Sequence, residues 1–484
     1  MANSPPIHRL HSDILWRFFS LNADMELGDE DSKPAMFTLR TISQVCPLWR
    51  GIAMNSPSLW GRVINIDVVF KRRATSLTKW GNEILRRSGD SDLYIRATID
   101  VGIKEDVVES LLRQNRHRIR SLDLEFQERP ISGEKLQGIF GVPAVALENF
   151  RIHCDGYEKE SKFVLFQNNA PSLRRVSTTN FMVDLKKLLG VSNLRYIQSS
   201  SPIPTVELLS SLFLAPFPFL ECVVCDDFGA RPKDAEEAVL PSPHPISLPC
   251  LRRIELVVTY EVNNTLTMLT HITPNERCAL NLSVEEYFVD NSTFAILREV
   301  LPKYLRCAAQ MSPATDLCLI MHQNRFMFCQ YRGRSFSFHM QLPDGLHDRA
   351  ISTFPSCFAH TTFRFDSIEE LVLRVEGDDV DFLLANESME KLVLGLVSVK
   401  FLETDSETLV YLNRFLLKTG IVPFPSLRTV KSPLEDADQL IQDFRDARAA
   451  AGVAAPYIDV QDIKGFRLYR IGSQTRGTRT HPRV

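Results

Sequence analysis

The sequence predicts an α/β fold in which a small module of three helices precedes an irregular α/β solenoid. Two observations indicate the module: the four tryptophans all lie at or before Trp80, and Pro47 interrupts an apolar, helix-like run among them. The third observation is a short strand-like pattern that recurs through most of the remaining chain. With 44% hydrophobic and 24% charged residues, the composition is that of a globular protein with enough apolar side chains for a large core.

The N-terminal helices are predicted from apolar spacing. Apolar residues in 7–21 recur at helical intervals, with Ser12 or Asp13 placed to cap the first turn. A second helix follows an acidic loop. A proline inside a helix costs about 3 kcal/mol, whereas at the first helical position it costs almost nothing. We therefore expect the second helix to end near Val45 and a third helix to begin at Pro47.

These residues resemble the F-box. The order L-x-x-(D/E)-(I/L)-L…F, then VC-x-x-W-R-x-(I/L)-A, then P-x-LW is typical of this family, and especially of the F-box-like proteins expanded in mushroom-forming fungi. The resemblance covers Ile7–Asp67. The matching positions are Leu10, Asp13, Ile14, Leu15, Phe18, Val45, Cys46, Trp49, Arg50, Ile52, Ala53, Leu59 and Trp60.

The resemblance implies that the module binds a Skp-type adaptor, which recruits a cullin scaffold and so a ubiquitin-transfer machinery. The chain would then be the non-enzymatic substrate receptor of a ubiquitin ligase complex, with a protein substrate bound to its repeat region. A module this small cannot build a large core, so part of its apolar surface is available to a partner helix. The residues expected to contact the adaptor are Leu10, Ile14, Leu15, Phe18, Val45, Trp49, Leu59 and Trp60.

Two departures from the family pattern favour an alternative. The family usually has proline directly after the first leucine, where this chain has His11, and the acidic loop 22–34 is longer than in a compact F-box. In the alternative the F-box has decayed, and the chain is a repeat scaffold for protein interactions outside ubiquitin transfer. The apolar residues of the module would then pack on the domain behind it.

The repeated pattern has apolar residues at positions one, four and often six, and several copies follow a P-x-x or P-S-L lead-in. The first six copies start 21 to 31 residues apart, which is typical of a leucine-rich-repeat solenoid. The Asn or Cys expected after L-x-x-L-x-L is absent from most copies, so we expect an irregular leucine-rich-repeat-like solenoid, interrupted around 275–360. The copies are Ile119–Leu124, Leu147–Ile152, Leu173–Thr178, Leu194–Ser199, Leu220–Cys225, Leu251–Leu256, Ile368–Leu373, Met389–Leu394 and Leu427–Val430.

The predicted domain organisation follows from these patterns. An F-box-like helical module spans 1–67, the solenoid spans 68–471, and 472–484 is a basic tail with no periodic apolar residues, expected to be disordered. We expect no signal peptide and no membrane span, because apolar runs are short and broken by proline. Ten scattered cysteines then indicate reduced thiols in the cytoplasm or nucleus.

The sequence contains no recognisable catalytic motif, so we expect no enzyme, no cofactor and no metal. Cys222 and Cys225 form a CxxC, but a structural zinc site needs four ligands and no second pair lies at suitable spacing. The motif also overlaps a repeat strand, where Cys225 falls on the buried phase. The formal charge of −3 and basic clusters without interleaved aromatics argue against a nucleic-acid partner.

The repeats instead offer a surface. If positions one, four and six point inward, positions three, five and seven point to an exposed concave face, because side chains alternate along a strand. Charges of both signs with one aromatic residue favour a protein ligand over a polyanion, although an inert solvated face is equally compatible with the pattern. The predicted substrate-binding residues are Asp123, Glu125, Arg151, His153, Arg175, Ser177, Tyr196, Gln198, Arg253 and Glu255.

Overall fold

The computed structural model describes residues 10–460 with gaps at 24–34, 70–78, 100–104, 128–137, 156–163, 182, 184–190, 201–208, 210–216, 227–245, 286–288, 312–313, 323, 331, 333–334, 344, 360–364, 376–379 and 433–437. These residues form two compact units: unit 1 holds those up to 200 together with 217 and 218, and unit 2 holds residue 209 and those from 219 to 460. Both units are mixed α/β and contain mostly parallel strands, which confirms the α/β class.

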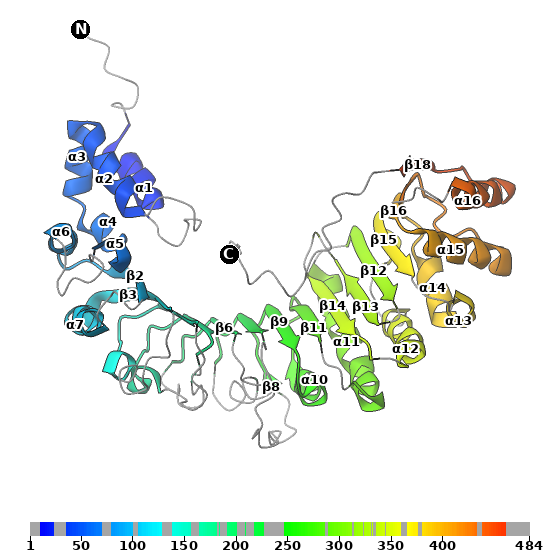
Figure 1. Cartoon of the computed structure of the whole chain (residues 1–484), viewed down its shortest axis with the longest axis horizontal. Helices are drawn as coiled ribbons and strands as arrows, with labels where there is room; N and C mark the ends of the chain where they lie inside the picture. Colours follow the sequence, from blue (N-terminus) through cyan, green and yellow to red (C-terminus); the bar gives the residue numbers. More distant parts are fainter. Residues whose placement is uncertain are drawn as a thin grey trace, which may run out of the picture. The chain divides into compact units, whose positions relative to one another are not determined.

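Unit 1 begins with a group of short helices (Figure 1). The second of them ends at Val45 and the third starts at Pro47, with Cys46 extended between them, as expected. The first-turn prediction was wrong: the N-cap is His11, whose Nδ1 accepts from the Asp13 amide at 3.3 Å, rather than Ser12 or Asp13. The helices are α1 (Ser12–Asn22), α2 (Ala35–Val45), α3 (Pro47–Met54), α4 (Pro57–Gly61), α5 (Ile66–Val69), α6 (Lys79–Ser88) and α7 (Glu105–Asn115).

The strands of unit 1 pair in parallel and in chain order. These strands agree with the predicted repeat pattern. Residues at positions four and six of each copy are buried, and the residue between them is partly exposed. Each copy pairs with the copy before it. The strands are β1 (Ile64–Asn65), β2 (Leu93–Ile99), β3 (Ile119–Phe126), β4 (Asn149–Cys154), β5 (Arg175–Thr179) and β6 (Tyr196–Ser200). Under them the rings of Phe140, Phe150 and Phe166 pack edge to face, with centroids 5.2 to 6.3 Å apart.

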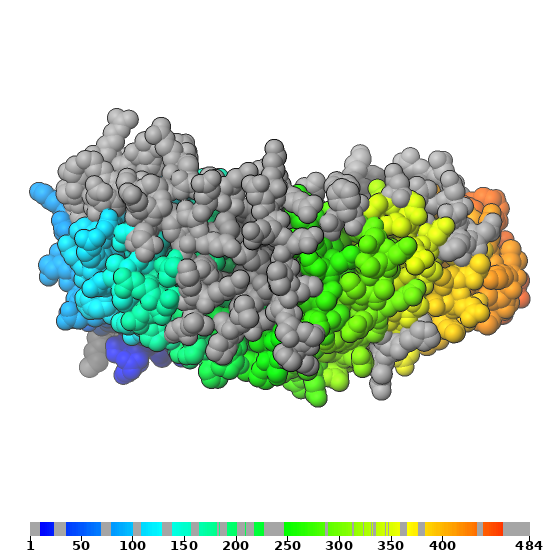
Figure 2. Space-filling view, turned by 90° about the horizontal axis from the view of Figure 1, so that it is seen from below, coloured from blue at the N-terminus to red at the C-terminus, as the bar shows by residue number. Residues whose placement is uncertain are grey.

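Unit 2 also combines mostly parallel strands with helices, which are longer here and line one side of its strands (Figure 1). Its segments follow one another along the surface in chain order (Figure 2). Its helices are α10 (Val262–His271), α11 (Asn291–Met311), α12 (His347–Ala359), α13 (Val380–Ala385), α14 (Glu387–Gly395), α15 (Ser406–Thr419) and α16 (Asp438–Ala450). Its strands are β7 (Cys222–Asp226), β8 (Ile246–Ser247), β9 (Arg253–Val258), β10 (Ile272–Thr273), β11 (Ala279–Val284), β12 (Asp316–His322), β13 (Arg325–Cys329), β14 (Phe336–Gln341), β15 (Glu370–Val375), β16 (Phe401–Glu403), β17 (Thr429–Ser432) and β18 (Tyr457–Val460).

An antiparallel insertion interrupts the parallel strands of unit 2, where the sequence predicted an interruption. The strand order is β7-β9-β11-β14-β13-β12-β15-β16-β17-β18, and only β13 runs against its neighbours among the described strands of this sheet. After β11 the chain passes through α11 to β12 and then fills the space between them with two hairpins. Below these strands Phe326 and Phe328 stack on Phe354 and Phe358 of α12, with centroids 4.1 and 3.9 Å apart.

One predicted repeat strand is a helix. The copy at Met389–Leu394 lies inside α14, which starts where Asn386 accepts from the amides of Ser388 and Met389, both at 3.0 Å. The apolar residues at positions one, four and five of this copy also fit the spacing of a helix. Such a short pattern therefore could not distinguish a strand from a helix. The next strand of the sheet is β16, ten or so residues further on.

The proline lead-ins form tight turns before the strands. The amides of Leu173, Leu251 and Leu427 donate to the carbonyl three residues earlier, at 3.1, 3.0 and 3.0 Å. Proline therefore occupies the second position of each turn, where its fixed φ is favourable. The turn delivers position one of the repeat to the core.

The predicted boundaries at residues 67 and 471 stay predictions, and the basic tail 472–484 lies outside the described residues. In the part of the chain that the structure describes, no helix is long and apolar enough to cross a membrane.

Gly61 marks a close approach between α4 and the start of β2. A Cβ at this position would collide with the main-chain oxygen of Asp92. We predict that Gly61→Ala lowers the free energy of unfolding by about 1–3 kcal/mol, as overpacking commonly does. Gly51→Ala is the matched control, because no atom lies within 4 Å of its added methyl group, and alanine should be neutral or stabilising by about 0.5–1 kcal/mol in a helix. Equal unfolding midpoints of the two variants in denaturant would contradict this packing.

Candidate functional site

Helix α1 carries two apolar stripes. One stripe, including Leu15 and Phe19, is buried in the module. The other is open to solvent: Ile14 is 56% and Phe18 51% exposed, and the exposed Leu21 lies on the same side of the helix, three residues after Phe18. Leu10, just before the N-cap, is also exposed. A helix of a small domain needs only one apolar stripe to fold, so the second is available for a partner.

Further apolar side chains are exposed on the neighbouring helices. Phe37 and Val45 lie on α2, and Leu48 and Met54 lie on α3. The predicted adaptor-binding set therefore falls into two groups. Leu10, Ile14, Phe18 and Val45 are exposed, whereas Leu15, Trp49, Leu59 and Trp60 are buried in unit 1.

The buried tryptophans hold the module together. Trp49 packs edge to face on Phe19, with ring centroids 5.0 Å apart. Trp60 is fully buried, and its Nε1 donates to the carbonyl of Ala53 at 2.8 Å. These two rings can therefore affect a partner only by maintaining the shape of the surface above them.

A cation joins the module to helix α6. The guanidinium of Arg87 lies 4.5 Å from the ring centroid of Trp60 and 5.3 Å from that of Trp80. Glu83 accepts from Arg87 Nε at 2.7 Å and keeps its charge paired. Stacking of a guanidinium on an indole stabilises by about 0.5–2 kcal/mol, more when water is excluded. This contact packs α4 against α6 and accounts for two of the four early tryptophans, Trp60 and Trp80, a role that the sequence did not predict.

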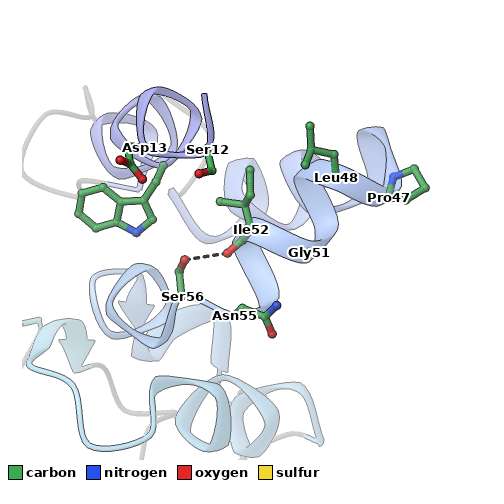
Figure 3. A pocket seen from close by; sticks show the side chains of 9 residues that line it. Ser12, Asp13, Pro47, Leu48, Gly51, Ile52, Asn55 and Ser56 are labelled. Carbon is green, nitrogen blue, oxygen red and sulfur yellow. Dashed lines mark hydrogen bonds between the residues drawn. The ribbon is translucent and has the colours of Figure 1, made fainter. Parts of the chain in front are cut away.

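An open groove of about 530 Å³ lies between α1 and α3 (Figure 3). Ile52 points into the space between the two helices, where Ser12 and Asp13 lie, and the Ser56 hydroxyl donates to the Ile52 carbonyl at 2.7 Å. Trp16, Leu48, Pro47, Gly51 and Asn55 complete the lining. A groove lined by both apolar and polar side chains suits a side chain of a protein partner.

His11 keeps the backbone path that proline would impose. Its φ of −62° is the value that a proline ring would fix, and its ψ of 145° is one that proline commonly adopts. The departure from the family pattern therefore changes the side chain and adds a cap to α1 without redirecting the chain that enters the helix.

The predicted substrate-binding residues of unit 1 lie where the alternation placed them. All eight are partly or fully exposed, and parallel pairing aligns Asp123, Arg151, Ser177 and Gln198 in one row across β3 to β6. Asp123 lies between two cations: its Oδ2 is 3.5 Å from Arg151 and 3.9 Å from Arg96. Arg96 was missed because its strand, β2, lacks the repeat pattern.

The two predicted residues of unit 2 are paired with each other. Arg253 and Glu255 lie on the same face of β9 and form an ion pair. Asn281, which was not predicted, donates to Glu255 Oε1 at 3.1 Å from the neighbouring strand β11. Partly exposed pairs of this kind contribute little to stability, so their value lies in the pattern of charge that they present.

The CxxC motif does not bring its two thiols together. Cys222 and Cys225 are three residues apart in β7 and so lie on opposite faces of the strand, with Cys225 buried. Among the described residues, no cluster of three or more His, Cys, Asp or Glu side chains is arranged to hold a metal ion.

Ser283 and His339 form a buried pair that resembles a nucleophile and its base, but the hydrogen bonds run the wrong way. Arg325 Nε donates to His339 Nε2 at 3.0 Å, which leaves the ring proton on Nδ1, 3.0 Å from the Ser283 oxygen. The serine hydroxyl donates in turn to Glu285 at 3.3 Å. The histidine therefore cannot take the serine proton, and the network is structural.

No protein-family model matches this chain, and a search of curated proteins found no significant relative.

The buried imidazole predicts a pH dependence of stability. Burial first, and the Arg325 charge second, lower the pKa of His339 to about 4, from about 6.5 in the unfolded chain. The unfolded state therefore binds the proton more tightly, so the contribution is complete above about pH 6.5 and is lost as the pH falls towards 4. We predict that the wild type loses about 3 kcal/mol more than His339→Gln across this window. Denaturant unfolding at a series of pH values measures this, and parallel curves would contradict it.

Proposed function

We propose that this chain is a non-enzymatic substrate receptor of a cullin-RING ubiquitin ligase. Its N-terminal helices act as an F-box that docks to a Skp-type adaptor, and its parallel strands bind a protein substrate. The contribution to ubiquitin transfer is positional: a tethered substrate has a high effective concentration near the transfer machinery.

The exposed stripe of α1 carries the proposal. Ile14 and Phe18 remain exposed although the module already has a core of its own, built on Leu15, Phe19 and Trp49. An apolar surface of this kind on a folded module marks a protein-interaction site. Aromatic and aliphatic anchors supply most of the binding energy in such interfaces, and the groove beside α3 can receive an anchor from the partner.

The backbone at His11 favours this function over the decayed-F-box alternative. Since the chain follows a path that proline would also follow, replacement of the proline does not by itself remove the adaptor surface. The alternative, an interaction scaffold outside ubiquitin transfer, remains the second candidate because the sheet face would serve it equally well.

For the rest of the chain we propose an irregular leucine-rich-repeat-like solenoid. A main-chain hydrogen bond that recurs at position two of the repeats supports the solenoid. In unit 1 the amides of Glu148, Arg174 and Arg195 each donate, at 2.8 Å, to the position-two carbonyl of the preceding copy. In unit 2 the amides of Arg252 and Lys400 donate to the position-two carbonyls of Glu221 and Glu369, both at 2.8 Å. One unit cannot bury its apolar face alone, so each copy depends on its neighbours.

The proposal predicts that substitutions at exposed residues of α1 weaken adaptor binding, whereas substitutions at its buried residues lower stability. Ile14→Ala and Phe18→Ala should each weaken adaptor binding by about 2 kcal/mol or more, roughly thirtyfold, with little change in stability. Leu15→Ala, at a side chain only 2% exposed, should instead lower the free energy of unfolding by about 2–5 kcal/mol. Binding is measured by calorimetry with a purified Skp-type adaptor, and stability by denaturant unfolding.

Leu417→Ala is the matched control, since Leu417 is an 81% exposed leucine on a helix of unit 2. It should leave adaptor binding unchanged. If the parent chain does not bind the adaptor, or if a folded Ile14→Ala, Phe18→Ala double variant binds like the parent, the receptor function is wrong and the scaffold function replaces it.

A further inference from the structure

The antiparallel insertion in unit 2 brings two cysteines face to face. Cys318 of β12 and Cys329 of β13 are register partners. Residues directly opposite each other in antiparallel strands have Cα atoms about 4.5 or 5.5 Å apart, depending on their hydrogen bonding. Both spacings fall within the range of about 4.4–6.8 Å that a disulfide spans.

The two side chains share one face of the sheet. Phe326 and Phe328 of β13 point to the helices and stack on α12, so Cys329, next to Phe328, points to the opposite side. There Cys318 and Cys329 cluster with Ile320, Met327 and Val372, and are 7% and 4% exposed. The thiol of Cys329 lies within hydrogen-bonding reach of Cys318, and this contact together with burial raises the pKa of the Cys318 thiol well above its ordinary value.

We propose that Cys318 and Cys329 are a site of reversible oxidation, which a peroxide converts to a disulfide across β12 and β13. One thiolate attacks a peroxide oxygen, forms a sulfenic acid and releases the second oxygen as water after protonation. The other thiol attacks the sulfenic sulfur and displaces its hydroxyl group as a second water. Two thiols and one hydrogen peroxide thus give one disulfide and two waters, and a thiol reductant reverses the reaction.

Other cysteines are placed differently. Cys278 and Cys307 are buried, but each thiol donates to a main-chain carbonyl, at 3.7 and 3.5 Å. Cys222 and Cys225 lie on opposite faces of one strand. The register of two adjacent strands, by contrast, holds Cys318 and Cys329 opposite each other without any backbone rearrangement.

The site adjoins the face proposed to bind substrate. Parallel pairing aligns Glu255 of β9 with Asn281 and Ser337, and the hairpins continue this row to Cys329 and Cys318. The row continues from Cys318 to Val372 of β15, so oxidation would link two neighbouring strands within it. The inference does not depend on adaptor binding, and failure of either proposal leaves the other in place.

The test uses the reduced full-length protein, treated with hydrogen peroxide, then unfolded and alkylated for peptide mass spectrometry. The titre of free thiols should fall from ten to eight per chain, with a peptide linked through Cys318 and Cys329 that dithiothreitol separates. Cys329→Ser should abolish the linked peptide, and Cys222→Ser should retain it. Circular dichroism checks that each variant is folded. The linked peptide identified in the parent chain tests the proposal even if a variant does not fold.

The thiolate is the attacking species, and at Cys318 its fraction is small because the pKa of that thiol is raised. The rate of disulfide formation should therefore rise about tenfold per pH unit between about pH 7 and 9. The proposal is overturned if Cys318 and Cys329 stay fully alkylatable across this range, or if either cysteine links to a different partner.

Discussion

Parallel main-chain pairing between successive repeats is the constraint on which both units depend. The amide of Arg174 donates to the carbonyl of Glu148, and the amide of Glu148 donates to that of Arg120, so each copy enters the sheet at the same phase as the last. Because side chains alternate along a strand, this common phase sends positions four and six of the copies that form strands to the core of their own unit. The same phase leaves positions three and five on the opposite face of the sheet. One hydrogen-bond pattern therefore determines both the core and the candidate binding face.

The N-terminal module illustrates how a small core can leave apolar side chains for a partner. Trp49, Trp60 and Arg87 pack beneath the helices and join them to α6. The inner stripe of α1 is buried in this way, whereas Ile14 and Phe18 stay about half exposed, and Phe18 meets the core through an edge contact with Phe19, at 6.4 Å between ring centroids. The stability of the module and the chemistry of its surface are therefore separable, since different residues of the same helix carry them.

On the sheet faces, opposite charges lie next to each other and not in separate patches. Asp123 lies between Arg96 and Arg151, and Glu255 between Arg253 and Asn281. A ligand that binds such a face must replace these ion pairs and hydrogen bonds with contacts of its own. The arrangement therefore favours selectivity for the ligand over high affinity. Such a face differs from a basic groove for a polyanion, in which cations would outnumber their partners.

The sequence by itself determined the helix boundary at Pro47, the strands of the repeats and the exposed phase of residues such as Arg151 and Gln198, because local sterics and side-chain alternation decide these features. It could not distinguish Ile14 from Leu15, or strand from helix at Met389–Leu394. An apolar residue can face a core, a partner or a neighbouring helix, so its type alone does not tell which. A short run of apolar residues can also fit both the period of a helix and the period of a strand. Only the tertiary structure decided which tryptophans are buried, that β13 runs antiparallel, and that Cys318 meets Cys329. These facts depend on contacts between segments far apart in the chain, for which no local pattern carries a signal.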